Sequence, residues 1–272
     1  MPELPEVETT RRGIEPHVTG ATVREVIVRR GDLRQPVSPS LSDIAGLKFT
    51  GVQRRAKYLL LEIADGSSVL IHLGMSGNLR VVAPGEAWKK HDHVGITLDK
   101  HRQLRFHDPR RFGLVLHLTT QDPYSHPLFK DLGPEPLADD FTANHLQRAC
   151  ANRSAAIKLV IMDSHVVVGV GNIYASEALF RAGIRPLTAA RRLSLPRLAR
   201  LVAAIRAVLT ESIAAGGTTL RDFLNSEGKP GYFSQSLQVY GRTGEPCHLC
   251  GAAIRHAVAG QRATYWCPKC QH

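Results

Sequence analysis

Residues 58–74, YLLLEIADGSSVLIHLG, form two apolar runs separated by an Asp65-Gly66 turn. Apolar runs of this length around an Asp-Gly pair are typical of a β-hairpin. The pattern continues on both sides, with ATVREVIV before it and VGITLDKHRQLRFHD and FGLVLHL after it. Because strand-like segments fill residues 21 to 120, they predict an N-terminal β-sandwich.

A short helix is expected before these strands. Pro5 suits a first helical position, and Glu6 and Glu8 complement the positive end of a helix dipole. We expect this helix to end near Gly13. The first residues of a domain usually fray, so the prolines and glutamates of MPELPEVE also raise the question of whether they take part in chemistry.

The pattern changes to helices in the second half of the chain. DLGPEPLADDF, residues 131–141, has no periodic apolar pattern and predicts a linker. In SLPRLARLVAAIRAVLTESIAAGG the apolar residues recur at helical spacing, with Ser194 as the cap and Gly216 as the stop. We therefore expect an α+β fold in three domains, which are residues 1–133, 134–238 and 239–272.

The charge balance points to a polyanionic partner. The chain has 272 residues, with 35 Lys+Arg against 24 Asp+Glu, a net charge of +11 and a pI near 9.8. A pI above ~9 is typical of a nucleic-acid-binding protein. No apolar stretch reaches the ~18 to 20 residues of a membrane span, and the acidic start is unlike a signal peptide. We expect a cytoplasmic protein, with a monomer as the default because no oligomerisation seam is visible.

Four cysteines near the C-terminus have the spacing of a zinc site. Cys247 and Cys250 are followed by sixteen residues and then by Cys267 and Cys270, which fits the C-x2-C-x15–20-C-x2-C pattern. Since all four ligands are cysteine, no position is left for water, so we expect one structural zinc ion. Two disulfides are the alternative, which the absence of a secretion signal disfavours.

The residues between the two cysteine pairs predict a β-hairpin. Its tip would present Gln261 and Arg262. An arginine on a hairpin stiffened by zinc suits phosphate contact, because its planar fork matches the phosphate oxygens. A solvated surface arginine is the alternative.

Seven motifs stand in order along the chain: MPELPEVE, HLGMSG, DPRRFG, VVGVGNIYASE, GGTTLRDF, GKPGYFSQSLQVYGR and the cysteine quartet. Together they make the chain resemble the formamidopyrimidine-DNA glycosylase family from end to end. The resemblance implies a helix-two-turns-helix motif in the second domain and a zinc-finger hairpin in the third. It also implies a bifunctional repair enzyme that removes oxidised purines, notably 8-oxoguanine and formamidopyrimidines, from double-stranded DNA. The enzyme then cuts the strand by β,δ-elimination.

The resemblance places the chemistry at the N-terminus. Once the initiator methionine is removed, Pro2 presents an amine, and an α-amine titrates near ~7.7 to 8.0 against ~10.4 for lysine, so it is a ready nucleophile. By resemblance, Pro2 attacks the sugar to form an iminium, Glu3 donates or shuttles a proton at the deoxyribose, and Glu6 orients the site. Lys57 corresponds to a lysine near the lesion's phosphate and base. A cation at a strand end is the alternative for Lys57.

A base inside a duplex must be flipped out before it can be excised, and the hole must be filled. By resemblance the fillers are Met75, Arg110 and Phe112, although Met75 and Phe112 taken alone are more often core residues. Asn172 follows two glycines at the start of an expected amphipathic helix. The N-terminus of such a helix is an anion site, here for a DNA phosphate. The further residues that the resemblance assigns to DNA binding are His91, Lys158 and Arg262.

The chain departs from the family pattern in two places. Arg221 stands where lysine is usual and Leu159 where proline is common. Arg221 falls in the glycine-rich stretch from Gly216 to Tyr240, which we expect to close over the flipped base. Two alternatives remain: an endonuclease VIII-like enzyme acting on oxidised pyrimidines, and a lesion-binding protein without turnover. MPELPEVE, DPRRFG and the long loop disfavour the first, and the retained catalytic set disfavours the second.

Overall fold

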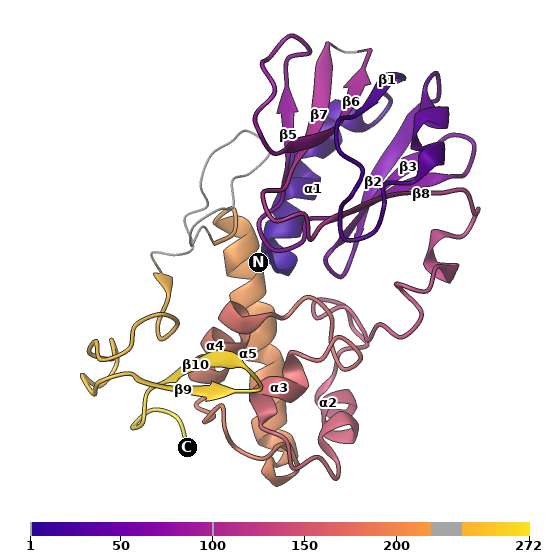
Figure 1. Ribbon diagram of the computed structural model, residues 1–272. Coiled ribbons are helices and arrows are strands. Elements are labelled where there is room, and N and C mark those ends of the chain that lie inside the picture. Colours follow the sequence, from indigo (N-terminus) through magenta and orange to yellow (C-terminus); the bar gives the residue numbers. More distant parts are fainter. Residues whose placement is uncertain (1, 100, 219–235) are drawn as a thin grey trace. The chain divides into compact units, whose positions relative to one another are not determined.

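The computed structural model describes residues 2–99, 101–218 and 236–272. Their contacts divide them into two compact units, drawn in Figure 1. Residues 2–99, 101–130 and 215–218 belong to the first unit, and residues 131–214 and 236–272 belong to the second. The expected boundaries at 133/134 and 238/239 stay a prediction.

The first unit contains a helix, α1 (Leu4–Val18), and two four-stranded antiparallel sheets. The hairpin expected at residues 58–74 is formed by β3 and β4, which pair from Tyr58↔His72 to Glu62↔Ser68. One sheet has the order β1-β6-β7-β5, with β1 at Val23–Val28, β6 at Asp92–Leu98, β7 at Arg102–His107 and β5 at Asn78–Val82. The other has the order β2-β3-β4-β8, with β2 at Phe49–Arg55, β3 at Tyr58–Ile63, β4 at Ser68–His72 and β8 at Leu114–Leu118.

One apolar core joins the two sheets and α1. It contains Phe106 from the first sheet, Phe49 and Ile71 from the second, and Ile14 from the helix, all of them buried. Alternate residues of a strand point to opposite faces, so each sheet offers one apolar face to this core. The predicted β-sandwich with a leading helix is confirmed.

The leading helix is longer than the sequence pattern indicated. We expected it to end near Gly13, but α1 continues to Val18 and closes with a bond from Thr19 N to Glu15 O. Ile14 and Val18 are fully buried. A glycine inside a helix costs about 1 kcal/mol, whereas burying two branched apolar side chains contributes roughly 3–6 kcal/mol. Burial therefore outweighs the glycine, and the expectation was wrong.

The second unit is built from helices and ends in a hairpin. Its longest helix, α5, begins after Ser194 and ends two residues before Gly216, which has a φ of +77°, so both predicted limits are confirmed. Residues 131–141 form neither helix nor strand, as expected for a linker. The other elements are α2 (Ala143–Cys150), α3 (Ile157–Ile161), α4 (Asn172–Arg181), β9 (Arg255–Ala259) and β10 (Arg262–Trp266), with α5 at Leu195–Ala214.

The two turns between α3 and α4 form the expected helix-two-turns-helix motif. Helix α4 differs from its prediction, because the expected amphipathic pattern is absent and every residue of Ile173–Phe180 is buried. The polar members of this stretch are bonded: Ser176 Oγ donates to Asn172 O at 2.9 Å. Among the described residues, none of the helices has both the length and the apolar character needed to cross a bilayer.

Replacing Ile14 by alanine tests the extension of α1. We expect Ile14→Ala to lower the free energy of unfolding by about 2–5 kcal/mol, because it leaves a cavity between the helix and the sheets. Glu15→Ala, on the outer side of the same turn, should change it by about 0.5 kcal/mol or less. Urea denaturation measures both. Equal effects of the two substitutions would show that this turn does not contribute to the core.

Candidate functional site

The beginning of the chain is buried and held by hydrogen bonds. Pro2, Glu3 and Glu6 are all buried. Glu6 Oε2 accepts a bond from Glu3 N at 2.8 Å, and Glu6 Oε1 accepts one from Thr218 N at 2.7 Å. A Cβ on Gly217 would come within 3.1 Å of Glu6 Oε1, so glycine permits this close approach. Glu6 thus links the backbone of Glu3, the residue next to Pro2, to Thr218, which is far away in the sequence.

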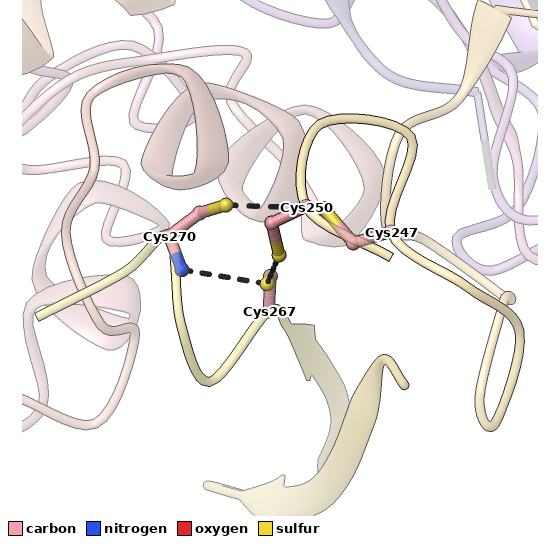
Figure 2. Close-up of side chains that lie close together, drawn as sticks. All are labelled: Cys247, Cys250, Cys267 and Cys270. Atoms are coloured by element: carbon pink, nitrogen blue, oxygen red, sulfur yellow. Dashed lines mark hydrogen bonds between the residues drawn. The ribbon is translucent and has the colours of Figure 1, made fainter. Parts of the chain in front are cut away.

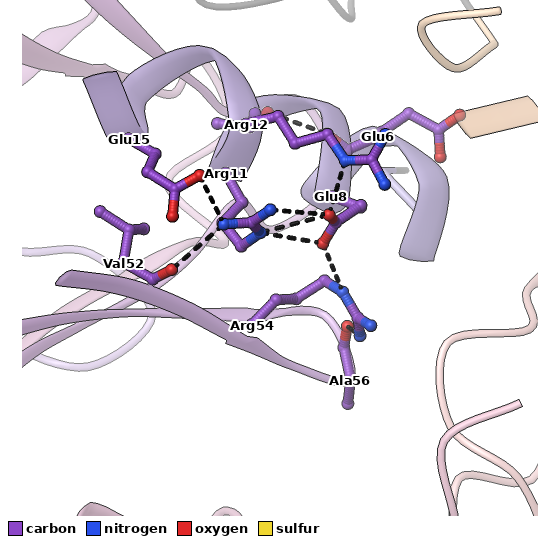
Figure 3. Close-up of polar contacts among 9 residues, drawn as sticks. Glu6, Glu8, Arg11, Arg12, Glu15, Val52, Arg54 and Ala56 are labelled. Carbon is purple, nitrogen blue, oxygen red and sulfur yellow. Dashed lines mark hydrogen bonds and ion pairs between the residues drawn. The ribbon is translucent and has the colours of Figure 1, made fainter. Parts of the chain in front are cut away.

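A second glutamate binds α1 to the sheet. Glu8 accepts hydrogen bonds from Arg11 and Arg12 on its own helix and pairs with Arg54 Nε of β2 at 3.1 Å (Figure 3). Burial raises the pKa of Glu8, but the hydrogen bonds from Arg11 and Arg12 outweigh it and hold the pKa below its usual range. The carboxylate is therefore ionised near neutral pH and keeps its three arginine partners.

The same arginine reaches the turn that contains Lys57. Arg54 Nη1 donates to Ala56 O at 3.0 Å, and Ala56 has a positive φ of 54°. Lys57 is half-buried in this two-residue turn between β2 and β3. The structure therefore connects the helix that begins beside Pro2 to the hairpin that presents Lys57.

His72 links this hairpin to the HLGMSG loop. Its Nδ1 accepts a bond from Gly74 N at 3.0 Å, and its ring lies 5.0 Å from that of Tyr58. Burial, together with the positive charges of Lys57 and Arg34, lowers the pKa of His72 from 6.5 to about 4. The ring is therefore neutral at pH 7, which is the state that lets Nδ1 accept the hydrogen bond.

The residues expected to fill the hole left by a flipped base lie in two touching loops. Arg110 and Phe112 are exposed, and the Arg110 guanidinium carbon is 4.8 Å from the centre of the Phe112 ring. Phe112 is 44 % exposed, so it is not a core residue. Met75 is half-buried in the facing loop, where a Cβ on Gly74 would come within 2.6 Å of the Phe112 carbonyl carbon. The structure thus places the loop of Met75 against the loop of Arg110 and Phe112.

His91 lies in the same unit, just before β6. Its ring is half-buried and packs edge-on against His107 and His93, with ring centres 5.8 and 6.3 Å apart. Arg262 lies in the second unit, where it is exposed as the first residue of β10. The tip of the hairpin is therefore formed as expected, with Gln261 at a positive φ of 61° beside it.

Lys158 has a different environment from the one expected of a surface phosphate ligand. It is fully buried, and its Nζ donates to Ala263 O at 2.7 Å and to Thr264 Oγ1 at 3.0 Å. Both acceptors belong to β10, so Lys158 binds the hairpin to α3. Its predicted contact with DNA stays a prediction.

Asn172 begins α4, as expected. Its Nδ2 is 3.5 Å from the Tyr240 hydroxyl, and its Oδ1 is buried without a hydrogen-bond partner among the described residues. With the side-chain amide turned over, its oxygen accepts from the Tyr240 hydroxyl and its NH2 group remains available as a donor. A donor at a helix N-terminus is the group that a phosphate oxygen requires.

Glu177 is a buried residue that sequence reasoning missed. Its carboxylate accepts three backbone bonds, from Gln238 N at 2.8 Å, Val239 N at 3.0 Å and Tyr240 N at 2.9 Å. A glutamate on a helix is ordinarily solvated, and only the apolar residues on every side of α4 could have signalled its burial. The preceding part of the expected base-covering loop, residues 219–235 with Arg221, lies outside the described residues.

The four tail cysteines converge on one point, shown in Figure 2. Their sulfurs all lie within 4.8 Å of one another, with Cys247 and Cys270 Sγ 3.9 Å apart and Cys250 and Cys267 Sγ 3.4 Å apart. A tetrahedral zinc ion with bonds of about 2.3 Å separates its sulfurs by about 3.8 Å. The quartet therefore fits one structural zinc ion, and these distances are too long for disulfide bonds of about 2.05 Å.

The zinc-binding segment packs on α4. A small core unites Phe180 of that helix with Val239, Ile254 and the ligands Cys247 and Cys267. Around the ligands, Cys270 N donates to Cys267 Sγ at 3.4 Å, a bond of the kind that orients metal-binding thiolates. The metal site thus supports both the hairpin and the residues that Glu177 binds.

Comparison with known proteins agrees with this geometry. Three family models match: the Formamidopyrimidine-DNA glycosylase N-terminal domain at residues 1–115, the Formamidopyrimidine-DNA glycosylase H2TH domain at residues 132–224, and the zinc finger found in FPG and IleRS at residues 244–272. A formamidopyrimidine-DNA glycosylase of Thioalkalivibrio sulfidiphilus is 58% identical over the full length of both chains.

Solved structures show the same fold. The MutM (Fpg) protein of Thermus thermophilus is 39% identical with a TM-score of 0.88, covering 99% of this chain and 98% of that one. A mutant of the Lactococcus lactis enzyme, in complex with DNA that contains Fapy-dG, is 32% identical with a TM-score of 0.92 and covers all of both chains.

The neutral state of His72 predicts a pH dependence. The pKa of His72 is about 4 in the folded protein and 6.5, its ordinary value, in the unfolded chain. As the pH falls, the unfolded chain therefore takes up the proton first. The contribution of His72 to stability is present above pH 6.5 and is lost as the pH falls toward 4. We expect His72→Phe to flatten the stability profile in this window, as measured by urea denaturation at each pH. A wild-type profile parallel to that of the variant would contradict the assignment.

Zinc removal should affect the second unit and DNA binding. We expect native mass spectrometry to find one zinc ion per chain, and chelation or Cys250→Ser to unfold the tail and weaken binding to duplex DNA. The matched control is Cys150→Ser, a buried thiol outside the quartet, which should retain the metal. Metal-free protein that binds duplex as tightly as the holo-protein would rule out this role for zinc.

Proposed function

This chain belongs to the formamidopyrimidine-DNA glycosylase family, and we propose that it excises oxidised purines, notably 8-oxoguanine and formamidopyrimidines, from duplex DNA. After excision it cuts the strand at the abasic sugar. The observation that supports this most directly is the burial of Pro2 and Glu3, with the backbone N–H of Glu3 held by Glu6. The net charge of +11 favours the phosphate backbone as partner.

The proposed chemistry uses the amine of Pro2. Its nitrogen bonds to C1′ of the damaged nucleotide as the glycosidic bond breaks, and the base leaves with the electron pair and takes up the proton that the amine releases. Glu3 donates a proton at the deoxyribose ring, which opens to give an iminium between Pro2 and C1′. The iminium acidifies the C2′ proton, so its removal expels the 3′ phosphate, and a second elimination then expels the 5′ phosphate.

Glu6 and Lys57 support this reaction in the proposal. Glu6 has both oxygens bonded to backbone N–H groups, so it orients Glu3 rather than exchanging protons with the substrate. Lys57 lies in the turn fixed by Arg54, where its ammonium can neutralise the phosphate beside the lesion. Both assignments agree with the resemblance drawn from the sequence.

The exposed pair of Arg110 and Phe112 provides for base flipping. Extruding a base costs a few kcal/mol of stacking and pairing. The ring of Phe112 and the side chain of Met75 can fill the space that the extruded base leaves in the stack. The guanidinium of Arg110 pairs with the base on the opposite strand that has lost its partner. His91 lies in the same unit and is proposed to contact the backbone near the lesion.

The second unit is proposed to grip the DNA backbone. Arg262 and the amide of Asn172 are the phosphate ligands, and Lys158 positions Arg262 through β10. When bound, the zinc ion cross-links the two ends of the tail and stiffens the hairpin. In this proposal residues 1–133 are the catalytic domain, 134–238 the helical domain and 239–272 the zinc finger, and the protein works in the bacterial cytoplasm at the nucleoid.

Two measurements separate this proposal from its alternatives. An endonuclease VIII-like enzyme would excise thymine glycol faster than 8-oxoguanine from otherwise identical duplexes, whereas we expect the reverse. A lesion-binding protein without turnover would bind the 8-oxoguanine duplex tightly and release no base.

The amine mechanism predicts a trapped intermediate. Sodium borohydride added to the protein and an 8-oxoguanine duplex should reduce the iminium and leave DNA bonded to residue 2, as located by peptide mass spectrometry. An uncleaved tag before Pro2 should abolish trapping and nicking while duplex affinity is retained, because it converts the amine to an amide. The same tag at the C-terminus is the control. Full nicking by the N-terminally blocked protein would refute the mechanism.

A further inference from the structure

One buried carboxylate joins the two loops that contain Met75, Arg110 and Phe112. Asp108 is fully buried. Its Oδ1 accepts a bond from Ser76 Oγ at 3.1 Å, across to the HLGMSG loop.

Within its own loop, Asp108 accepts two further bonds. Arg110 N donates to Oδ1 at 3.3 Å and Gly113 N donates to Oδ2 at 2.8 Å. The carboxylate thus spans the turn that presents Arg110 and Phe112, and it holds that turn against the neighbour of Met75.

The backbone of Asp108 extends this connection to a third segment. Asp108 N donates to His91 O at 3.0 Å, and Asp108 O lies 2.8 Å from His93 Nε2. Asp108 O also accepts from Arg111 N at 3.2 Å. Met75, His91, Arg110 and Phe112 are therefore each bonded to Asp108 or adjacent to a residue that is.

The packing leaves these loops little room to shift. A Cβ on Gly113 would come within 2.5 Å of Phe106 Cζ and 2.7 Å of His72 O. A Cβ on Gly74 would come within 2.5 Å of Gly113 N. Because the loop backbones are this close, the orientation of the turn depends on the hydrogen bonds that cross it, and Asp108 accepts three of them.

We propose that Asp108 is a positioning residue for base extrusion. It holds the Met75 loop and the Arg110–Phe112 turn in the geometry needed for insertion, so that little side-chain and loop freedom is lost when the wedge enters the duplex. Asp108 contacts neither the substrate nor Pro2 in this role. The inference rests on the proposed function, since it assigns the residue to the step that precedes cleavage of the glycosidic bond.

Asp108→Asn tests the proposal with little change in shape. The asparagine amide has only one acceptor oxygen, and its NH2 group replaces the other. Some of the three donors, Ser76 Oγ, Arg110 N and Gly113 N, then lack an acceptor. We expect the single-turnover excision rate of 8-oxoguanine opposite cytosine to fall by about tenfold or more. When the same lesion lies opposite an abasic-site analogue, extrusion is easier and no widowed base is left for Arg110. The variant should then excise within about threefold of wild type.

The matched control is Asp32→Asn. Asp32 forms an exposed ion pair with Arg111 of the same loop, and such pairs contribute little. This variant should excise at the wild-type rate from both duplexes. If Asp108→Asn unfolds, Ser76→Ala removes only the bond between the loops and should give the same selective loss, smaller in size. Thermal denaturation of each variant shows that the fold is intact.

The outcomes separate the two proposals. Wild-type protein that neither excises nor traps would overturn the proposed function itself. If the wild type is active and both Asp108→Asn and Ser76→Ala excise normally from the paired duplex, the role of Asp108 is refuted. Equal losses on both duplexes would also refute it, because they would place the defect at the chemical step rather than at extrusion.

Discussion

The candidate site depends on the two hydrogen bonds that the carboxylate of Glu6 accepts. A chain terminus normally frays, yet the proposed reaction requires the amine of Pro2 to be held at a fixed place. Glu6 meets this need by accepting bonds from Glu3 N and from Thr218 N, which is 212 positions away in the sequence. A buried carboxylate is tolerated only when it is bonded, so the two N–H groups and the carboxylate hold one another in place.

From this point a series of buried polar contacts extends through the first unit. Glu8 and Arg54 connect α1 to the turn of Lys57. His72 and Asp108 connect that hairpin to the two loops that lie against each other. The sandwich core beneath is apolar, so it fixes the sheets but not the directions of these turns. Directional bonds decide the turns, which is how a rigid scaffold can present exposed residues such as Phe112 accurately.

The second unit follows the same principle with different groups. Lys158 and Glu177 are both buried on helices of the helix-two-turns-helix motif, and each binds the backbone of a segment far along the chain. Lys158 supports β10, and Glu177 supports residues 238–240, directly before the zinc-binding tail. The metal then closes the tail on itself. Both buried charged side chains therefore bind other parts of the chain within this unit.

The sequence by itself determined what depends on local pattern. The hairpin at residues 58–74, the limits of α5 and the cysteine spacing all follow from residues close together in the chain, and the family resemblance follows from short motifs in a fixed order. Only the tertiary structure decided the true end of α1, the burial of α4 and the partners of Glu177 and Asp108. Whether a polar residue is buried depends on what packs around it. Glu177 meets its partners 61 to 63 positions away and Lys158 meets its partners 105 and 106 positions away, separations that no periodicity records.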